Sequence, residues 1–128
     1  MRVLLDTCTF LWIVSGASEL SETARRTFRE TGNEIYLSAA SVWEIAVKHA
    51  LGRLPLPGDP DALIPAWRSA HAIEPLAVDE AAVLQLTRLP RLHRDPFDRM
   101  LVCQAIAGGM VILTPDREVA AYPVRTLW

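Results

Sequence analysis

Three short runs of aliphatic residues constrain the fold of this chain more than any other feature of its sequence. They read RVLLD at residues 2–6, EIYLS at 34–38 and MVILT at 110–114. Each run is too short for a buried helix and lacks the alternation of a half-exposed strand. Each is therefore predicted to be a strand covered on both faces, which is typical of a parallel sheet.

Helical patterns separate these strands. Residues 21–31 begin with Ser21 as an N-cap, and residues 41–52 carry an apolar stripe that ends at a glycine. Residues 96–108 are apolar nearly all round, which predicts a buried helix. Asp95 is expected to cap this last helix, with a proline in its first position.

Strands that alternate with helices predict an α/β fold in three layers. We expect a central, mostly parallel sheet of four to five strands flanked by helices. Further short strands are expected at residues 72–78 and 124–128, the latter at an edge of the sheet.

Length and composition predict a single soluble domain over residues 1–128. Hydrophobic residues make up 51% of the chain and charged residues 22%. Cys8 and Cys103 are expected to be buried free thiols in a reducing compartment. Arg2 and the apolar run after it resemble a signal peptide, but Asp6 interrupts that run, and no stretch reaches the roughly 18 apolar residues of a membrane span. We therefore expect a cytoplasmic protein with no membrane association.

Four acidic residues fall where strands end or helices begin. Asp6 ends the first strand, Glu44 is expected in the first turn of the helix after the second strand, Asp98 lies in the first turn of the helix from 96, and Asp116 follows the third strand. In a parallel α/β fold all these places face one edge of the sheet. Clustered carboxylates without histidine or cysteine suit a hard cation such as Mg²⁺ or Mn²⁺.

Each acid also has a local structural explanation. Asp6 is able to cap the next helix, Asp116 to sit in a turn, and Glu44 to complete a capping box with Ser41 or pair with Lys48. Local capping does not require four distant carboxylates to meet at one edge. Their convergence favours a divalent-metal site that acts on a phosphodiester.

The basic residues are 12 arginines and one lysine, and the net charge is −2. Arginine suits phosphate, although base composition of the genome explains such a balance equally well. Arg94, Arg99 and Arg117 flank the acids and are candidates for contacts with an RNA backbone; ordinary surface ion pairing is the alternative. His93 is expected to be a hydrogen-bonded loop residue rather than a catalyst.

The chain resembles PIN-domain ribonucleases, specifically the toxins of VapC-type toxin–antitoxin pairs. The resemblance rests on LLDTCTFLW, NEIYLSAASVWEIAVKHALGRLPLP, LHRDPFDRMLVCQA, VILTPD and VRTLW, in this order from end to end. It implies metal-dependent endoribonuclease activity with Mg²⁺ or Mn²⁺, products with a 5′-phosphate, an intracellular homodimer, and a cognate antitoxin laid across the acidic groove.

Residue by residue, the resemblance implies that the four acids bind metal and catalyse the reaction. Asp95 is then accessory or a cap, and Thr7 and Thr114 are supporting hydroxyls. One position departs from the family pattern, because Cys8 stands where this branch usually has histidine or asparagine.

Two other interpretations remain open. The chain could be a catalytically inactive module that binds RNA or sequesters an antitoxin. It could also be a Mg²⁺-dependent phosphatase of the haloacid-dehalogenase type, which fits less well because such enzymes carry a second aspartate where this chain has Cys8.

Overall fold

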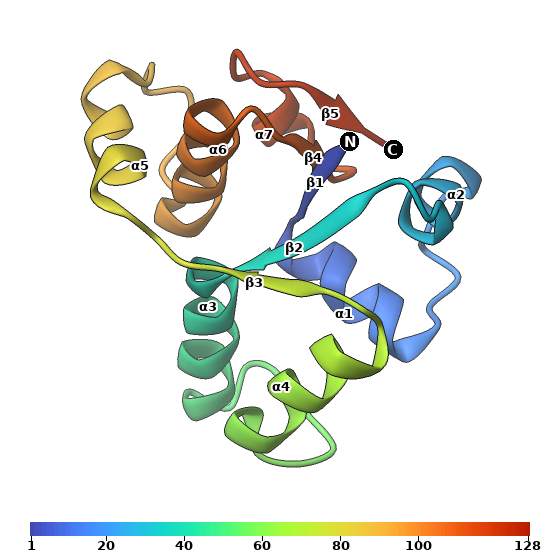
Figure 1. The fold of residues 1–128 in the computed structure, drawn as a ribbon. Coiled ribbons are helices and arrows are strands. Elements are labelled where there is room, and N and C mark those ends of the chain that lie inside the picture. Colours follow the sequence, from blue (N-terminus) through green and yellow to red (C-terminus); the bar gives the residue numbers. More distant parts are fainter.

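The computed structural model describes all residues from 1 to 128 and contains one five-stranded, wholly parallel sheet with the strand order β3-β2-β1-β4-β5 (Figure 1). This confirms the predicted α/β class and both of the additional short strands, which form the two edges. The strands are β1 (Arg2–Leu5), β2 (Glu34–Ser38), β3 (Glu74–Leu76), β4 (Val111–Leu113) and β5 (Thr126–Leu127).

The first strand lies at the centre of the sheet and pairs on both sides. Val3 is in register with Ile35 of β2 and with Val111 of β4. Val3, Leu4 and Leu5 are also fully buried, so both faces of β1 are covered. This explains why the sequence of the strand is a continuous apolar run.

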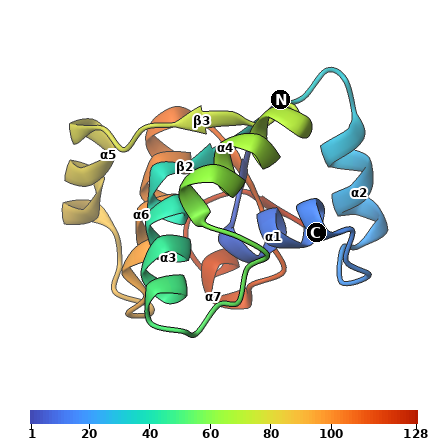
Figure 2. The same cartoon turned by 90° about the horizontal axis from the view of Figure 1, so that it is seen from below.

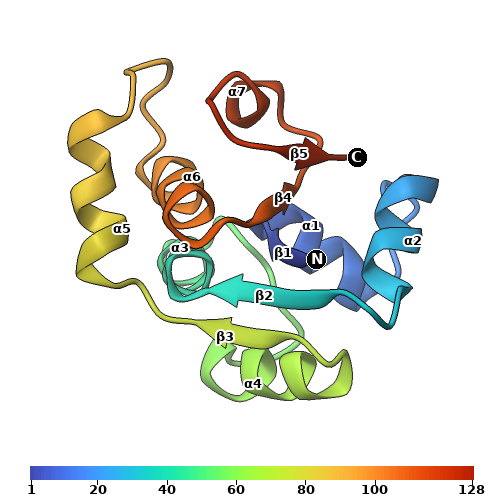
Figure 3. The same ribbon diagram turned by 45° about the horizontal axis from the view of Figure 1, so that its top comes forward.

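Seven helices cover the sheet in two layers. Helices α6 and α7 lie on one side of the sheet, and α1 and α4 lie on the other (Figures 1 and 3). The turned view in Figure 2 shows α3 between α6 and α4. The helices are α1 (Thr7–Ser15), α2 (Glu22–Arg29), α3 (Ala39–Ala50), α4 (Pro60–Ala70), α5 (Glu80–Gln85), α6 (Pro96–Gly108) and α7 (Arg117–Ala120), with a 3₁₀ turn, η1, at Leu86–Arg88.

Alternate residues of the central strand belong to two separate apolar cores. Val3 and Leu5 pack with Phe10 of α1 on one face of the sheet. Leu4 packs on the opposite face with residues of α6, including Leu101. The period of two along a strand thus divides the protein into the expected three layers.

The boundaries of α3 correct one prediction. The helix begins at Ala39 with Ser38 as its N-cap, two residues before the predicted start. Glu44 therefore lies in the second turn, and Ser41 is not the capping residue. Ser38 ends β2 as predicted and also caps α3, because its hydroxyl accepts the backbone N–H of Ala40 and the helix begins without any loop.

None of the helices is both long enough and apolar enough to cross a membrane.

Candidate active site

Three helix starts place four acidic side chains at the carboxyl edge of the sheet. Asp6, Asp95 and Asp116 are the N-caps of α1, α6 and α7, and each accepts a backbone N–H of the helix that it caps. Asp98 lies in the first turn of α6. Asp6 and Asp95 therefore cap helices as expected, and Asp116 caps α7 rather than lying in a simple turn. These caps do not exclude a shared site, because capping occupies only one oxygen of each of these three aspartates.

A threonine connects Asp6 to Asp116, which lie near opposite ends of the sequence. The hydroxyl of Thr114, a buried residue, donates to Asp6 Oδ2. The same hydroxyl accepts the backbone N–H of Asp116 at 3.0 Å. Asp6 Oδ1 accepts the Thr9 N–H at 2.8 Å. Asp6, which is 4% exposed, is thus held through both carboxylate oxygens.

Glu44 is buried and has a partner at each oxygen. Its Oε1 accepts the hydroxyl of Thr7 at 2.6 Å, which ties α3 to the residue that follows Asp6. Its Oε2 accepts Lys48, the only lysine of the chain. The hydrogen bond to Glu44, and then the charges of Glu44, Asp95 and Asp98, raise the pKa of Lys48 against the opposing effect of burial and keep it protonated.

The pKa of Asp98 reflects its burial and the charges of the neighbouring acids. It is raised from 3.8 to about 6, first by burial and then by the charge of Asp95, with smaller contributions from Asp116 and Glu44. A hydrogen bond with His93 acts in the opposite direction. The negative charge at this edge favours a bound cation.

His93 lies beside these acids, in the loop before α6. Its Nε2 is 3.2 Å from Asp98 Oδ2, and its Nδ1 is 2.7 Å from the hydroxyl of Tyr122. His93 is therefore a hydrogen-bonded loop residue, as expected, and one of its two partners, Asp98, is a candidate site residue. Tyr122 was not identified from the sequence, because a tyrosine 29 residues further along the chain carries no local signal of this contact.

The three arginines proposed to contact RNA lie in different surroundings. Arg94 and Arg117 are exposed and form no ion pair within the protein. Arg99 instead donates to the Pro90 carbonyl at 3.0 Å and to the Tyr122 hydroxyl at 2.9 Å. A hollow of about 750 Å³ lies on this side of the molecule; its lining residues are Leu86, Arg91, Leu92, His93, Arg94, Pro96 and Arg99.

Both cysteines are free thiols as expected, but only Cys103 is buried, and Cys8 is half-buried. The Cys8 thiol donates to Asp6 Oδ1 at 3.2 Å. Burial and then the charge of Asp6 raise the pKa of Cys8 to about 12, so it remains a neutral thiol. The residue that departs from the family pattern therefore supplies one weak donor to a candidate ligand.

The donor set fits a hard divalent ion, although the side chains are not gathered around one point. No group of three or more acidic, histidine or cysteine side chains is arranged to hold a metal ion. Asp98 Oδ1 and Asp116 Oδ2 accept no hydrogen bond from the protein. Asp6 Oδ2 and the two carboxylate oxygens of Glu44 each accept one hydrogen bond and keep a further lone pair. The absence of any nitrogen or sulfur ligand among the four acids suits Mg²⁺ or Mn²⁺.

The chain is similar to a curated protein over about half of its length. Ribonuclease VapC16 of Mycobacterium tuberculosis is 40% identical over 65 residues, which are 51% of this chain and 45% of that protein. The chain thus spans less than half the length of this curated relative.

Two solved structures share the fold along nearly the whole chain. A chain of the VapBC2 complex of Rickettsia felis bound to a promoter DNA fragment has a TM-score of 0.74 at 12% identity, over 99% of this chain and 98% of that one. A chain of the DNA-bound VapBC complex of Salmonella typhimurium has a TM-score of 0.71 at 22% identity, over 99% and 97%. The family model described as PIN domain matches residues 3–124, and the chain therefore belongs to the PIN-domain family.

Proposed function

We propose that this chain is a metal-dependent endoribonuclease and the toxin of a toxin–antitoxin pair. The observation that carries the proposal is the convergence of acids from separate helices at one sheet edge, where Thr114 joins Asp6 to Asp116 and Thr7 holds Glu44. The similarity to a ribonuclease, VapC16, agrees with it. We propose that residues 1–128 act as a single cytoplasmic domain of this kind.

In this proposal the four acids, Asp6, Glu44, Asp98 and Asp116, hold Mg²⁺ or Mn²⁺. A bound divalent ion supplies charge neutralisation at the phosphodiester and an activated water. Thr114 and Thr7 fix the orientations of Asp6 and Glu44 through the hydrogen bonds described above. Asp95 holds the first turn of α6 and adds negative charge beside Asp98.

RNA is the proposed substrate, and arginines are the proposed contacts to its backbone. Arg94 lines the hollow whose wall includes His93, so it lies next to the residue that contacts Asp98. Arg117 is the first residue of α7, directly after Asp116. Arg99 is the weakest of the three candidates, because the guanidinium already donates to two oxygens of the protein.

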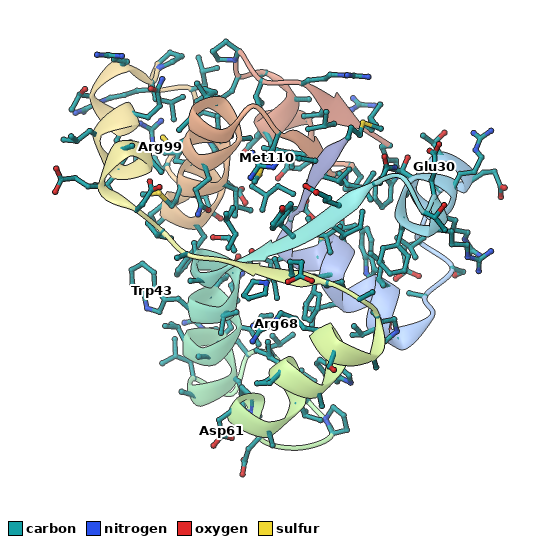
Figure 4. The ribbon with its side chains drawn as sticks, in the orientation of Figure 1. Glu30, Trp43, Asp61, Arg68, Arg99 and Met110 are labelled. Carbon is teal, nitrogen blue, oxygen red and sulfur yellow. The ribbon has the colours of Figure 1, made fainter.

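We further propose that an antitoxin covers this edge and that the protein forms a homodimer. The two structural relatives described above are VapBC complexes. Trp43 and Val47 of α3 and its C-cap residue Leu51 are exposed one turn apart, and Trp43 is 61% exposed (Figure 4). Trp43 also packs edge-on against Phe97, the neighbour of Asp98. An exposed apolar stripe beside the acids is a suitable surface for a protein partner.

The direct test is cleavage of a single-stranded RNA by the purified protein with Mn²⁺, followed by sequencing of the ends. We expect 5′-phosphate products, loss of cleavage with EDTA, and at least about a hundredfold loss in Asp98→Asn. Asp61→Asn is the matched control, since Asp61 is an exposed acid in the first turn of α4 (Figure 4).

Three outcomes would contradict the proposal. Equal cleavage by Asp98→Asn and the unmodified protein would remove Asp98 from the site. Binding of RNA without cleavage would favour the inactive module. Hydrolysis of a phosphate monoester in place of RNA would favour the phosphatase.

A further inference from the structure

The hydroxyl of Tyr122 is surrounded by three nitrogen atoms inside the protein. Tyr122 is 3% exposed. Its hydroxyl oxygen lies 2.9 Å from Arg99 Nη1, 3.2 Å from the backbone nitrogen of His93 and 2.7 Å from His93 Nδ1. Because the hydroxyl is buried, its hydrogen bonds are made within the protein and not to water, so these three nitrogen atoms determine where the hydroxyl proton points.

The number of protons on these atoms determines which atom donates and which accepts in each hydrogen bond of the network. Arg99 Nη1 and the backbone nitrogen of His93 are obligatory donors, and together they fill both lone pairs of the hydroxyl oxygen. The hydroxyl proton therefore points to His93 Nδ1, which must accept it. A neutral imidazole that accepts at Nδ1 carries its own proton on Nε2.

The Nε2 proton then points to the candidate site. Asp98 Oδ2 lies 3.2 Å from Nε2. The carboxylate of Glu118 is the only competing acceptor recorded, at 4.0 Å, and its side chain is 68% exposed. Donation to Asp98 Oδ2 leaves Asp98 Oδ1 without a protein partner and therefore available to a ligand.

We propose that Arg99, Tyr122 and His93 form a positioning relay of hydrogen-bond donors that holds Asp98 in one orientation for catalysis. The proposal rests on the proposed function, because it assigns these residues to the same site. Arg99 donates to the Tyr122 hydroxyl and fixes its position. The hydroxyl donates to His93 Nδ1 and so favours the Nε2–H tautomer, whose N–H orients the Asp98 carboxylate.

A neutral donor suits this position better than a cation would. Asp98 lies among carboxylates of like charge, which tend to push its side chain away. A lysine or arginine in place of His93 would hold the carboxylate, but it would also compensate the charge that attracts a divalent ion. The neutral imidazole fixes the orientation and leaves that charge available.

The first experiment compares two amide substitutions of His93. The amide nitrogen of His93→Gln reaches the place of Nε2, whereas that of His93→Asn reaches only the place of Nδ1. We expect His93→Asn to lose about 10- to 100-fold in kcat for RNA and in affinity for Mn²⁺ alone, with KM for RNA unchanged. His93→Gln should recover most of both losses. His71→Gln is the control, because His71 packs against Phe28 of α2 in the opposite layer.

The second experiment observes the tautomer without metal or RNA. Long-range ¹H–¹⁵N NMR of the imidazole should show the proton of His93 on Nε2 in the unmodified protein. Tyr122→Phe keeps the aromatic ring and removes only the hydroxyl, so the Nδ1–H form should become populated. This measurement remains informative if a His93 variant fails to fold.

The results separate this proposal from the proposed function. A proton on Nδ1 in the unmodified protein, wild-type kinetics in His93→Asn, or equal losses in the asparagine and glutamine variants would each overturn the relay. If the unmodified protein neither binds Mn²⁺ nor cleaves RNA, the proposed function is wrong, and with it the catalytic role of the relay.

Discussion

Asp98→Asn should stabilise the metal-free protein while it destroys the proposed activity. The folded protein raises the pKa of Asp98 from 3.8 to about 6, so folding disfavours the charged carboxylate. One pKa unit corresponds to about 1.4 kcal/mol, which sets an upper limit of about 3 kcal/mol on this cost at pH 7.5. The side chain is 20% exposed, so solvent reduces the value.

The neutral amide also loses one favourable interaction. Asp98 lies in the first turn of α6, where its charge and the helix dipole contribute about 0.3–1 kcal/mol. The amide oxygen still accepts the proton of His93. We therefore expect a net stabilisation of about 1–2 kcal/mol, or roughly 4–8 °C in Tm for a chain of this size.

The sign of the pH dependence follows from the raised pKa. Well below pH 3.8 the carboxyl is protonated in both folded and unfolded chains, and well above pH 6 it is charged in both. The cost is therefore small at pH 4, grows as the pH rises through 6, and is complete at pH 7.5. The stability difference between the variant and the unmodified protein should follow the same course.

Urea denaturation in EDTA at pH 4 and pH 7.5 measures this difference, with Asp61→Asn as the control. Addition of Mn²⁺ at a hundredfold excess over its Kd should stabilise only the unmodified protein, by about 2.7 kcal/mol, and so reverse the order of stabilities. A variant that is less stable than the unmodified protein in EDTA at pH 7.5, or a difference independent of pH, would refute the reasoning.

Three further predictions concern residues around the site and at the end of α6. Thr114→Val leaves a buried carboxylate oxygen of Asp6 without its donor, so urea denaturation should show a loss of about 1–3 kcal/mol, most of it recovered by Thr114→Ser. Because its pKa is raised to about 12, Cys8 should resist iodoacetamide at pH 8.5 until the protein unfolds, as mass spectrometry would report; rapid native labelling would contradict this. Gly109→Ala should lower the free energy of unfolding by about 1–2 kcal/mol in the same urea denaturation assay, because φ is 63°, in the left-handed region. An added Cβ meets no atom within 4 Å, so backbone strain is the only cost, and an unchanged stability would contradict this.

Features that depend on neighbouring residues were predictable from the sequence. The strand RVLL and the helix from Pro96 follow from apolar runs, and the N-cap role of Asp95 follows from its place before a proline. The positions of the candidate acids at one edge follow from the alternation of strands and helices. In each case the cause acts within a few residues along the chain.

The start of α3 was predicted less well, because a strand and a helix meet there without a loop. Ser38 both ends β2 and caps α3. Periodicity does not separate two elements that share a residue, so Glu44 was placed one turn too early. The error leaves Glu44 at the same edge, since its Oε1 still accepts the hydroxyl of Thr7.

The sequence by itself determined which residues form strands and helices and which acids reach the edge of the sheet, because local hydrogen bonding and burial encode these choices. Only the tertiary structure decided which groups touch across the site. Thr114 meets Asp6 across 108 residues, and Tyr122 meets His93 across 29. Such contacts arise when packed layers bring distant loops together, and hydrogen-bond geometry at that scale depends on positions within a few tenths of an ångström.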